Sequence, residues 1–467
     1  MIFPQFLEKV KRVHFVGIGG ISMSALAKYS LSLGLTVSGS DVCLNEQAES
    51  LKKAGVKIYK KHRSGNVRNV DLLVYSSATD KNNPEIKRAE KLGVTVMKRS
   101  EYLGGIVKDY PCSIGVCGSH GKTTVTAMIT HALKEAGLNP VAFIGGKDKL
   151  FGNFLAGGND YLVFEACEFK KNFLDVKPKI SVVLNIDDDH PDTFNGMADA
   201  VRTFAEFIKG TVSVINADDS YASALKEGLS VRTGIKTVAD YTAKRVTKND
   251  GKYSFTLCKY GIKSGRIRLA TEGKHNVYNA LSTCAVCDLL GIPFKSVKIA
   301  LEGFSSVERR NELLGSVGRT KCYADYAHHP SEINAFALSK GKGNYLTVFQ
   351  PHTYSRTEKL MGDFVKSLKE KNPLVIYSTY PAREKYCFSG SAEKLYAEIC
   401  LALKNNGETA LGRVFYAENR EKLFKILDKR SDADAIFFIG AGDIYDIAKA
   451  YVSQNGCPLS TSPSADG

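Results

Sequence analysis

The sequence lacks three features that would each point to a particular class of protein. No apolar run approaches the roughly 18 residues of a membrane-spanning helix, and no secretory signal pattern is present. The eleven cysteines stand singly, without the spacing of a disulfide framework. Such scattered cysteines are typical of a reducing compartment. We therefore expect a cytoplasmic protein without a membrane span.

Dense basic stretches are also missing, although the formal net charge is +15. Lysine and arginine are spread along the chain instead of forming the arm or stripe of a nucleic-acid footprint. The charge therefore favours small anionic substrates over nucleic acid, with a plain solvated surface as an equal alternative. The CxxC pair Cys284 and Cys287 has no second Cys or His pair nearby. It predicts core packing in a helix and not a zinc site.

What the sequence does contain is alternation of strand-like and helix-like segments over 467 residues, a length that calls for two to four domains. We predict an α/β protein with domains at 1–109, 110–310 and 311–454, a short antiparallel insertion at 240–268, and a disordered tail at 455–467. The predicted strands are 13–16, 36–39, 72–76, 94–97, 112–117, 161–164, 180–184, 212–215, 321–324, 345–349, 374–377 and 435–439.

The most informative motif is Gly118-Ser119-His120-Gly121-Lys122-Thr123-Thr124, between a predicted strand and a helix predicted over 123–136. Glycines allow backbone N–H groups to converge on a phosphate at a helix N-terminus, where Lys122 can reach the terminal phosphates and Thr123 can hold Mg²⁺. Val116 stands where the usual pattern has its first glycine. The alternative is a tight turn with a capping hydroxyl.

A second glycine-rich loop, from Gly17 through Gly19 and Gly20 to Ser22, also follows a strand and opens a helix. It resembles a dinucleotide fingerprint with Ser22 in place of the third glycine, and Asp41 after the next strand can bind a ribose or base. Alone it fits NAD, any other diphosphate, or a purely structural turn.

Polar side chains follow several further strands, at the sheet edge where ligands of parallel sheets bind. Glu165 ends one strand, and His190 follows the acidic run 187–189; near ATP they suit Mg²⁺, whereas the acids alone could cap helices. Asn276 and Asn279 lie three apart at a helix start, where amides can read a base edge, although Asn276 could instead be a helix cap.

Six of the nine histidines lie in polar clusters at predicted strand ends or loops. The stretches 325–330, with Tyr326 and His328, and 350–356, with His352 and Arg356, follow consecutive strands. Two such loops favour a small-molecule site. A metal site at His328 and His329 is the weaker alternative, because no acidic or Cys partner has ligand spacing.

Eight motifs together resemble the Mur ligase family, the amide-forming ligases of peptidoglycan synthesis. The resemblance covers about 12–453, and no single motif is decisive without the others. In chain order the motifs are HFVGIGGISMS from His14, GSHGKTT from Gly118, EACE from Glu165, the pair Asp189-His190, GKHNVYNA from Gly273, DYAHHP from Asp325, FQPHTYSRT from Phe349 and GAGD from Gly440.

The resemblance implies a three-domain architecture: a Rossmann-like N-terminal domain for a UDP-sugar, a central P-loop domain for ATP, and a Rossmann-like C-terminal domain for an amino acid. It implies ATP-dependent ligation of L-alanine to UDP-N-acetylmuramate through an acyl phosphate. The murein tripeptide ligases of the same family, which use the same nucleotide sugar, are the main alternative. The family also implies a monomer or weak homodimer with no nucleic-acid partner.

By the same resemblance, Lys122, Glu165 and His190 are catalytic, and Mg²⁺ is held by Thr123, Glu165 and His190. The resemblance further assigns Asn276, Asn279 and Arg310 to ATP, and Tyr326, His328, His352 and Arg356 to alanine. Three positions depart from relatives: Ser22 replaces a glycine, Cys167 replaces an acid, and Ala205 stands where sibling ligases carry a modified lysine.

Two unrelated classes remain open from the residues alone. A nicotinamide dehydrogenase explains the loop at Gly17 but leaves Lys122 without a role. A nucleic-acid-stimulated ATPase uses the positive charge, and its activity would fall steeply with salt.

Overall fold

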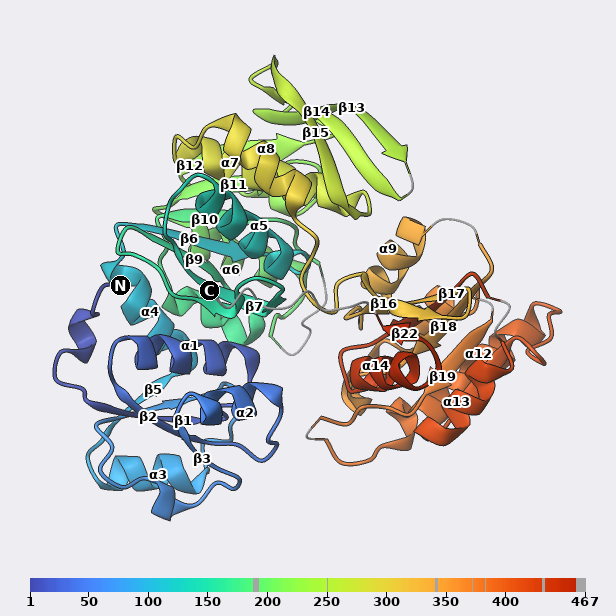
Figure 1. Cartoon of the computed structure of the whole chain (residues 1–467), viewed down its shortest axis with the longest axis horizontal. Coiled ribbons are helices and arrows are strands. Elements are labelled where there is room, and N and C mark those ends of the chain that lie inside the picture. Colours follow the sequence, from blue (N-terminus) through green and yellow to red (C-terminus); the bar gives the residue numbers. More distant parts are fainter. Residues whose placement is uncertain are drawn as a thin grey trace. The chain divides into compact units, whose positions relative to one another are not determined.

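The computed structural model describes residues 1–187, 193–249, 251–340, 343–371, 373–382, 384–430 and 433–458. The chain divides into two compact units, Met1–Val307 and Glu308–Gly467. Sheets flanked by helices build both units (Figure 1), two sheets in the first and one in the second. This arrangement confirms the predicted α/β class.

The N-terminal sheet is five-stranded and parallel, in the order β3-β2-β1-β4-β5 of a dinucleotide-binding fold. Inward residues alternate along β1: Phe15 packs toward α1 and α4, whereas Val16 packs toward α3. Helices therefore cover both faces. The elements are β1 Arg12–Val16, α1 Ile21–Ser32, β2 Thr36–Ser40, α2 Glu46–Lys53, β3 Lys57–Tyr59, β4 Leu72–Tyr75, α3 Pro84–Lys91, β5 Thr95–Lys98 and α4 Arg99–Asp109.

The second sheet is ten-stranded, in the order β15-β14-β13-β12-β11-β10-β6-β9-β7-β8. Its centre is parallel, and the antiparallel strands β13 to β15 extend one end, which confirms the antiparallel segment predicted at 240–268. The elements are β6 Cys112–Cys117, α5 Lys122–Glu135, β7 Val141–Asp148, β8 Gly152–Leu155, β9 Tyr161–Glu165, β10 Ile180–Val183, α6 Met197–Ile208, β11 Val212–Asn216, β12 Leu229–Gly234, β13 Tyr241–Asn249, β14 Lys252–Lys259, β15 Ile262–Glu272, α7 His275–Leu289 and α8 Phe294–Gly303.

These two sheets share one hydrophobic core. A single cluster of buried side chains joins Phe15 and Tyr102 of the N-terminal sheet region with Phe143, Phe164 and Phe204 of the second. The opposite face of the second sheet packs separately against α5, α7 and α8, where Cys284 and Cys287 are buried as predicted. The shared cluster explains why residues 1–307 form one unit.

The third sheet is seven-stranded, in the order β20-β19-β18-β21-β17-β16-β22, and is parallel from β20 to β17. Its faces pack as two clusters, one against α13 and α14 and the other against α9, α11 and α12. The elements are β16 Glu312–Val317, β17 Thr320–Asp325, α9 Pro330–Lys340, β18 Tyr345–Phe349, α10 Tyr354–Lys359, α11 Met361–Leu368, β19 Leu374–Tyr377, α12 Ala392–Asn405, β20 Val414–Ala417, α13 Arg420–Asp428, β21 Ala435–Ile439, α14 Ile444–Asn455 and β22 Cys457–Pro458.

The prediction of a disordered segment from 455 onward is wrong at its start. Asn455 ends α14, and β22 pairs with β16 through Pro458 opposite Gly315 and Cys457 opposite Ser316. Backbone pairing at a sheet edge needs little from side chains, so the Ser- and Pro-rich composition hides it. Residues 459–467 lie outside the described part of the chain.

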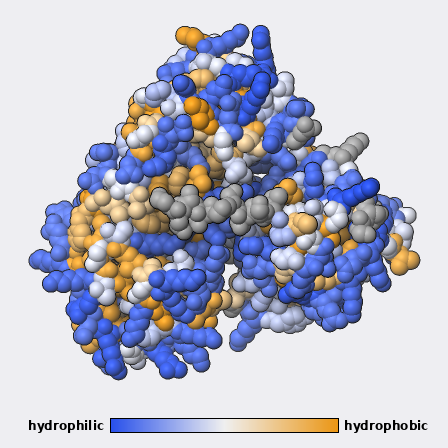
Figure 2. Space-filling model, in the orientation of Figure 1, coloured by the Kyte–Doolittle hydropathy of each residue, from blue (hydrophilic) through white to orange (hydrophobic). Residues whose placement is uncertain are grey.

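No helix among the described residues is both long enough and apolar enough to cross a bilayer. Figure 2 shows a mainly hydrophilic face with apolar side chains in patches. The antiparallel strands β13 to β15, at the top of this view, carry exposed Lys244, Lys248 and Arg266. Their outer side is therefore charged and solvated.

A buried amide ties the two sheets of the first unit together. Asn153 on β8 is 1 % exposed and donates hydrogen bonds to the Ile21 carbonyl (2.8 Å) and the Ser24 hydroxyl (2.9 Å), both on α1. Its oxygen accepts from Lys28, also on α1, at 2.7 Å. One side chain thus fixes the helix that follows the Gly17 loop.

Asn153→Ala is expected to lower the free energy of unfolding by about 2 kcal/mol, because it leaves buried partners on α1 unsatisfied. Urea unfolding followed by circular dichroism measures the loss. The control is Asn82→Ala, an exposed asparagine of the same unit. Equal, small effects of the two substitutions would contradict the role given to Asn153.

Candidate active site

The phosphate-binding loop lies where it was predicted, between β6 and α5. Gly118 and Gly121 have φ of +133° and +88°, a region that side chains strongly disfavour. Gly121 is the N-cap residue, and the helix begins at Lys122. The N–H groups of the first helical turn have no carbonyl partners in a preceding turn, so they can face an anion.

Asn185, two residues beyond β10, fixes the shape of this loop. Its Oδ1 accepts from the His120 N–H at 2.7 Å, and its Nδ2 donates to the His120 carbonyl at 3.0 Å. The Ser119 N–H donates to the Asn185 carbonyl at 3.2 Å. The N–H groups of Ser119 and His120 are therefore held by Asn185. The N–H groups of Gly121, Thr123 and Thr124, at the start of α5, can face a phosphate.

Lys122 points back over the loop. Its ammonium donates to the Ser119 carbonyl at 3.1 Å, to the Gly118 carbonyl, and to Glu168 Oε1 at 2.8 Å. Glu168 is 1 % exposed and Lys122 is 16 % exposed, so the pair is largely shielded from water. The positive charge of Lys122 therefore lies beside the phosphate-binding loop 118–124, which is called the cradle below.

Hard oxygen atoms gather beside the first turn of α5. The Thr123 hydroxyl donates to Glu165 Oε1, at the end of the neighbouring strand β9. Gly145 on β7 lies against the same carboxylate, and a Cβ there would overlap it. A hydroxyl and a carboxylate are ligands that Mg²⁺ prefers, so these residues fit the ion. His190, the third predicted ligand, lies outside the described residues.

The two predicted amide side chains meet on α7. Asn279 Nδ2 donates to Asn276 Oδ1 at 2.9 Å, and Asn276 Nδ2 donates to the Glu272 carbonyl at 2.7 Å. A Cβ on Gly121 would stand 2.9 Å from Asn279 Oδ1, so this pair lies against the loop. The helix-cap alternative for Asn276 is wrong, because Lys274 is the N-cap residue.

The Gly17 loop joins β1 to α1 as predicted. Gly17 has a φ of +82°, and its N–H donates to the Ser40 carbonyl at 2.8 Å. Asp41 accepts from the Gly19 N–H at 2.9 Å, while Asn45 donates to the Gly19 carbonyl at 2.9 Å. Asp41 thus braces the loop from within, a role that the sequence did not predict. Its contact with a ribose or base stays a prediction.

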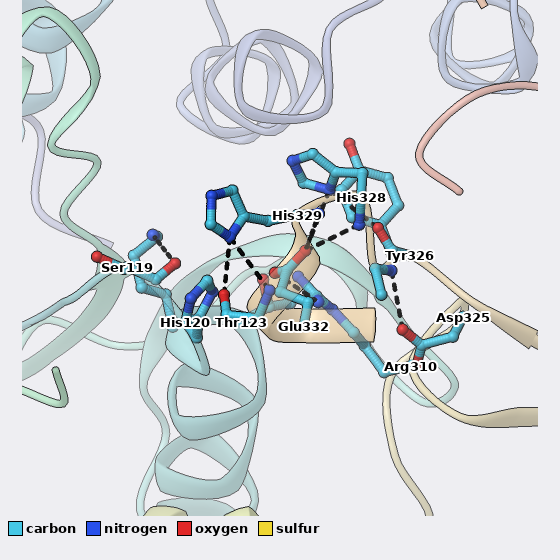
Figure 3. A network of polar contacts seen from close by, with 12 residues as sticks. Ser119, His120, Thr123, Arg310, Asp325, Tyr326, His328, His329 and Glu332 are labelled. Carbon is cyan, nitrogen blue, oxygen red and sulfur yellow. Dashed lines mark hydrogen bonds and ion pairs between the residues drawn. The ribbon is translucent and has the colours of Figure 1, made fainter. Parts of the chain in front are cut away.

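In the second unit, Tyr326 and His328 follow β17 directly (Figure 3). Glu332 accepts from the His328 N–H at 2.9 Å, and the Arg310 guanidinium lies 5.2 Å from the Tyr326 ring centre. Arg310 was predicted in the central ATP domain. It belongs to the second compact unit, which begins at Glu308.

His352 follows β18, and this strand is not beside β17, because β21 lies between them. Their loops nevertheless meet at one sheet edge, where the His328 and His352 ring centres are 5.8 Å apart. The His352 ring also stacks on Tyr380 at 5.7 Å. Gln350 joins the loop after β18 to the loop after β21: its side chain donates to Asp443 Oδ1 at 2.6 Å and accepts from the Ile444 N–H at 3.0 Å.

Both imidazoles are neutral near pH 7. Burial, together with a smaller contribution from the charge of Arg356, lowers the pKa of His328 to about 3 and the pKa of His352 to about 4. His328 Nδ1 lies 3.0 Å from the Tyr326 carbonyl, so it carries the proton and Nε2 can accept. His352 Nδ1 is buried and has no hydrogen-bond partner among the described residues.

Asp325, the last residue of β17, has a buried carboxyl group whose pKa is also shifted. Burial raises the pKa of Asp325 to about 6, although the charge of Arg310 opposes the shift. Asp325 accepts hydrogen bonds from the N–H groups of Asn311 at 2.7 Å and Ala327 at 2.8 Å. It therefore holds both ends of the hairpin formed by β16 and β17.

Sequence reasoning gave no role to three residues that build these sites: Asn185, Glu168 and Gln350. Each follows a strand closely, and that position was the available signal. Their partners, however, are backbone groups or side chains from distant segments. Spacing along the chain could not identify those partners.

Comparison with known families matches three descriptions in succession. "Mur ligase family, catalytic domain" covers residues 12–111, "Mur ligase middle domain" covers 116–287, and "Mur ligase, glutamate ligase domain" covers 309–442. The first match contains the whole N-terminal sheet, and the other two cover most of the second and third sheets. The three-domain architecture predicted from the motifs is confirmed.

Similar proteins match over almost the whole length. The UDP-N-acetylmuramate–L-alanine ligases of Acetivibrio thermocellus and Aquifex aeolicus are 38 % and 39 % identical, over 96 % of this chain and 97 % and 98 % of theirs. The solved UDP-N-acetylmuramate-alanine ligase of Thermotoga maritima superposes with a TM-score of 0.81 at 29 % identity, covering 95 % of this chain and 98 % of its own. A murein peptide ligase of Psychrobacter arcticus, 21 % identical over 96 % of this chain and 100 % of its own, shares the fold with a TM-score of 0.73. The chain belongs to the Mur ligase family.

Proposed function

We propose that this protein ligates L-alanine to the carboxylate of UDP-N-acetylmuramate, with conversion of ATP to ADP and phosphate. The observation that carries the proposal is that relatives 38 % and 39 % identical over 96 % of the chain bear the name of this activity. The cradle around Lys122 supplies the ATP chemistry that the reaction needs. The eleven free cysteines suit a reducing compartment, so we place the reaction in the cytoplasm.

The chemistry proceeds in two steps. A carboxylate oxygen of the sugar attacks the γ-phosphorus of ATP, which forms an acyl phosphate and releases ADP. The alanine amine then attacks the acyl carbon, loses its proton, and expels inorganic phosphate from the tetrahedral intermediate. Because an ionised carboxylate is a poor electrophile, the first step is what makes the second possible. The protein's contribution is positioning and charge neutralisation.

The ATP phosphates bind at the first turn of α5, where backbone N–H groups and the helix dipole favour negative charge. Lys122 neutralises charge on the transferred phosphoryl group. Thr123 and Glu165 would hold Mg²⁺, with His190 as a further ligand, and the ion would supply positive charge to the phosphates of ATP. Asn276 and Asn279, which lie against Gly121, contact the nucleotide. Arg310 is assigned to ATP by the family resemblance.

The nucleotide sugar binds at the N-terminal sheet. Its diphosphate lies at the start of α1, against the backbone of Gly17, Gly19, Gly20 and Ser22. Asp41 and Asn45 hold both backbone groups of Gly19, so the loop needs little rearrangement when a ligand arrives.

Alanine binds in the second unit beside Tyr326, His328, His352 and Arg356. Neutral His328, through Nε2, and neutral His352 are acceptors for the alanine ammonium. Arg356, whose charge is felt by both imidazoles, pairs with the alanine carboxylate. Acceptors and a cation placed together select a zwitterion.

The test is an amino-acid panel. Phosphate release in the presence of ATP and UDP-N-acetylmuramate is measured with L-alanine, glycine, L-serine and the murein tripeptide. The largest kcat/KM is expected with L-alanine. Faster turnover with tripeptide would instead assign the protein to the recycling ligases, and release stimulated by DNA or RNA would assign it to the ATPases.

Lys122→Ala is expected to reduce turnover about 100- to 1,000-fold, the loss typical when one preorganised donor to the transition state is removed. Calorimetric binding of UDP-N-acetylmuramate should remain, because the Gly17 loop is built from a different sheet. Lys134→Ala, an exposed lysine on the same helix, is the matched control and should retain activity. Loss of sugar binding with Lys122→Ala would refute the assignment of separate sites.

Arg356→Lys is expected to raise the KM for alanine about tenfold, since lysine cannot form the two parallel hydrogen bonds of a guanidinium to a carboxylate. The KM for ATP should stay unchanged. Initial rates at varied alanine concentration measure the effect, with exposed Arg420→Lys as the control. An unchanged alanine KM would remove Arg356 from the site.

A further inference from the structure

Glu168 is a buried carboxylate that the reaction described above does not use. It lies three residues beyond the end of β9, is 1 % exposed, and its Oε1 accepts from the Lys122 ammonium at 2.8 Å. Glu165, by contrast, contacts Thr123. The two acids of one motif therefore serve two different residues of the cradle.

The turn that carries Glu168 is held in a strained shape. Lys170 and Lys171, just after it, have φ of +52° and +57°, and the Lys171 N–H donates to the Glu168 carbonyl at 2.8 Å. Left-handed conformations at two successive non-glycine residues cost on the order of 1 kcal/mol each. Lys171 is anchored to Asp199 at 3.0 Å, and Lys170 to the Ser77 carbonyl at 2.8 Å. The fold thus retains a costly backbone that places this carboxylate against Lys122.

The three acceptors that the described residues offer to Lys122 differ in how easily a phosphate oxygen can replace them. The carbonyls of Gly118 and Ser119 are neutral, and a phosphate oxygen can replace either of them. Glu168 is charged and buried, so removal of its cation is costly. An ammonium has three N–H donors, enough to keep one acceptor while two change.

We propose that Glu168 is the positioning residue of the cradle: it keeps one N–H of Lys122 while the other two turn from the loop carbonyls to phosphate oxygens of ATP. The proposal rests on the proposed function, because it assumes ATP in the cradle. Glu168 fixes where the ammonium stands and offsets part of its charge. Its effect therefore falls on phosphoryl transfer, which depends on exact placement, more than on nucleotide affinity.

The main test is Glu168→Gln, which keeps the size of the side chain and removes its charge. The expected result is a fall in kcat of about 30-fold, with the KM for ATP unchanged or lower, since Lys122 then meets the phosphates without a competing anion. Glu49→Gln is the matched control: Glu49 pairs with Lys52 at 2.7 Å but is 52 % exposed. It should leave both constants unchanged.

A double-mutant cycle with Lys122→Met separates positioning from a general structural role. If Glu168 acts through Lys122, adding Glu168→Gln to Lys122→Met produces no further loss of residual turnover or of binding of a fluorescent ATP analogue. A further loss in the double variant would overturn the proposal. So would equal falls in kcat and ATP affinity with Glu168→Gln, or an unchanged kcat.

Glu168→Asp covers the case in which Glu168→Gln does not fold, as judged by thermal unfolding. Aspartate keeps the charge but withdraws it from Lys122, so a smaller fall in kcat at unchanged KM is expected; wild-type kcat would overturn the proposal. Failure of the proposed function shows differently, as wild-type protein that binds ATP but makes no amide. In that case ATP-analogue binding to the four proteins of the cycle still tests whether Glu168 and Lys122 act together.

Discussion

A loop that turns its N–H groups toward an anion must find other partners for its carbonyl oxygens, and the ATP site depends on how this chain meets that constraint. Lys122 bonds the carbonyls of Gly118 and Ser119, and the Asn185 amide bonds the carbonyl of His120. Both partners are anchored in turn, Lys122 by Glu168 and Asn185 by the end of β10. The cradle thus keeps its shape without a nucleotide, which lowers the ordering cost of binding one.

The second unit meets a different constraint, since its site is assembled from strands that are not neighbours. β21 separates β17 from β18, yet His328 and His352 meet above it. The loop after β21 makes this approach possible: a side chain at Gly442 would collide with Gln350 and Tyr380. Gln350 then bonds Asp443 and Ile444 of the same loop. Small residues and one amide let three strand ends share a space.

The sequence was a sufficient guide where local pattern decides structure. The strands 112–117, 345–349, 374–377 and 435–439 occur with the predicted bounds, because each is a short, almost wholly buried apolar run bounded by polar residues, proline or glycine. The phosphate-binding loop was also predicted from the sequence, because glycine at 118 and 121 allows the backbone conformation that such a loop needs. The strands that the sequence did not predict include β3 and β22, whose residues are partly or fully exposed and which pair at the edge of a sheet. Spacing along the chain does not encode contacts between distant segments. Such contacts determine the hydrogen bond of Asp41 to the Gly19 N–H, the hydrogen bonds of Asn185 to His120, and the order of β17, β21 and β18.

The core shared by the first two sheets has a consequence for how this chain can be divided. Tyr102 and Phe15 lie in one buried cluster with Phe143, Phe164 and Phe204. Yet the first family match ends at residue 111 and the second begins at residue 116, so the cluster spans both. A fragment that ended at the first family border would expose this apolar surface to water, and so would one that began there. The natural cut is at Val307, where one compact unit ends. An exchange of segments between relatives is therefore expected to preserve this core when the crossover follows Val307, and to cut through it when the crossover lies between the first two family matches.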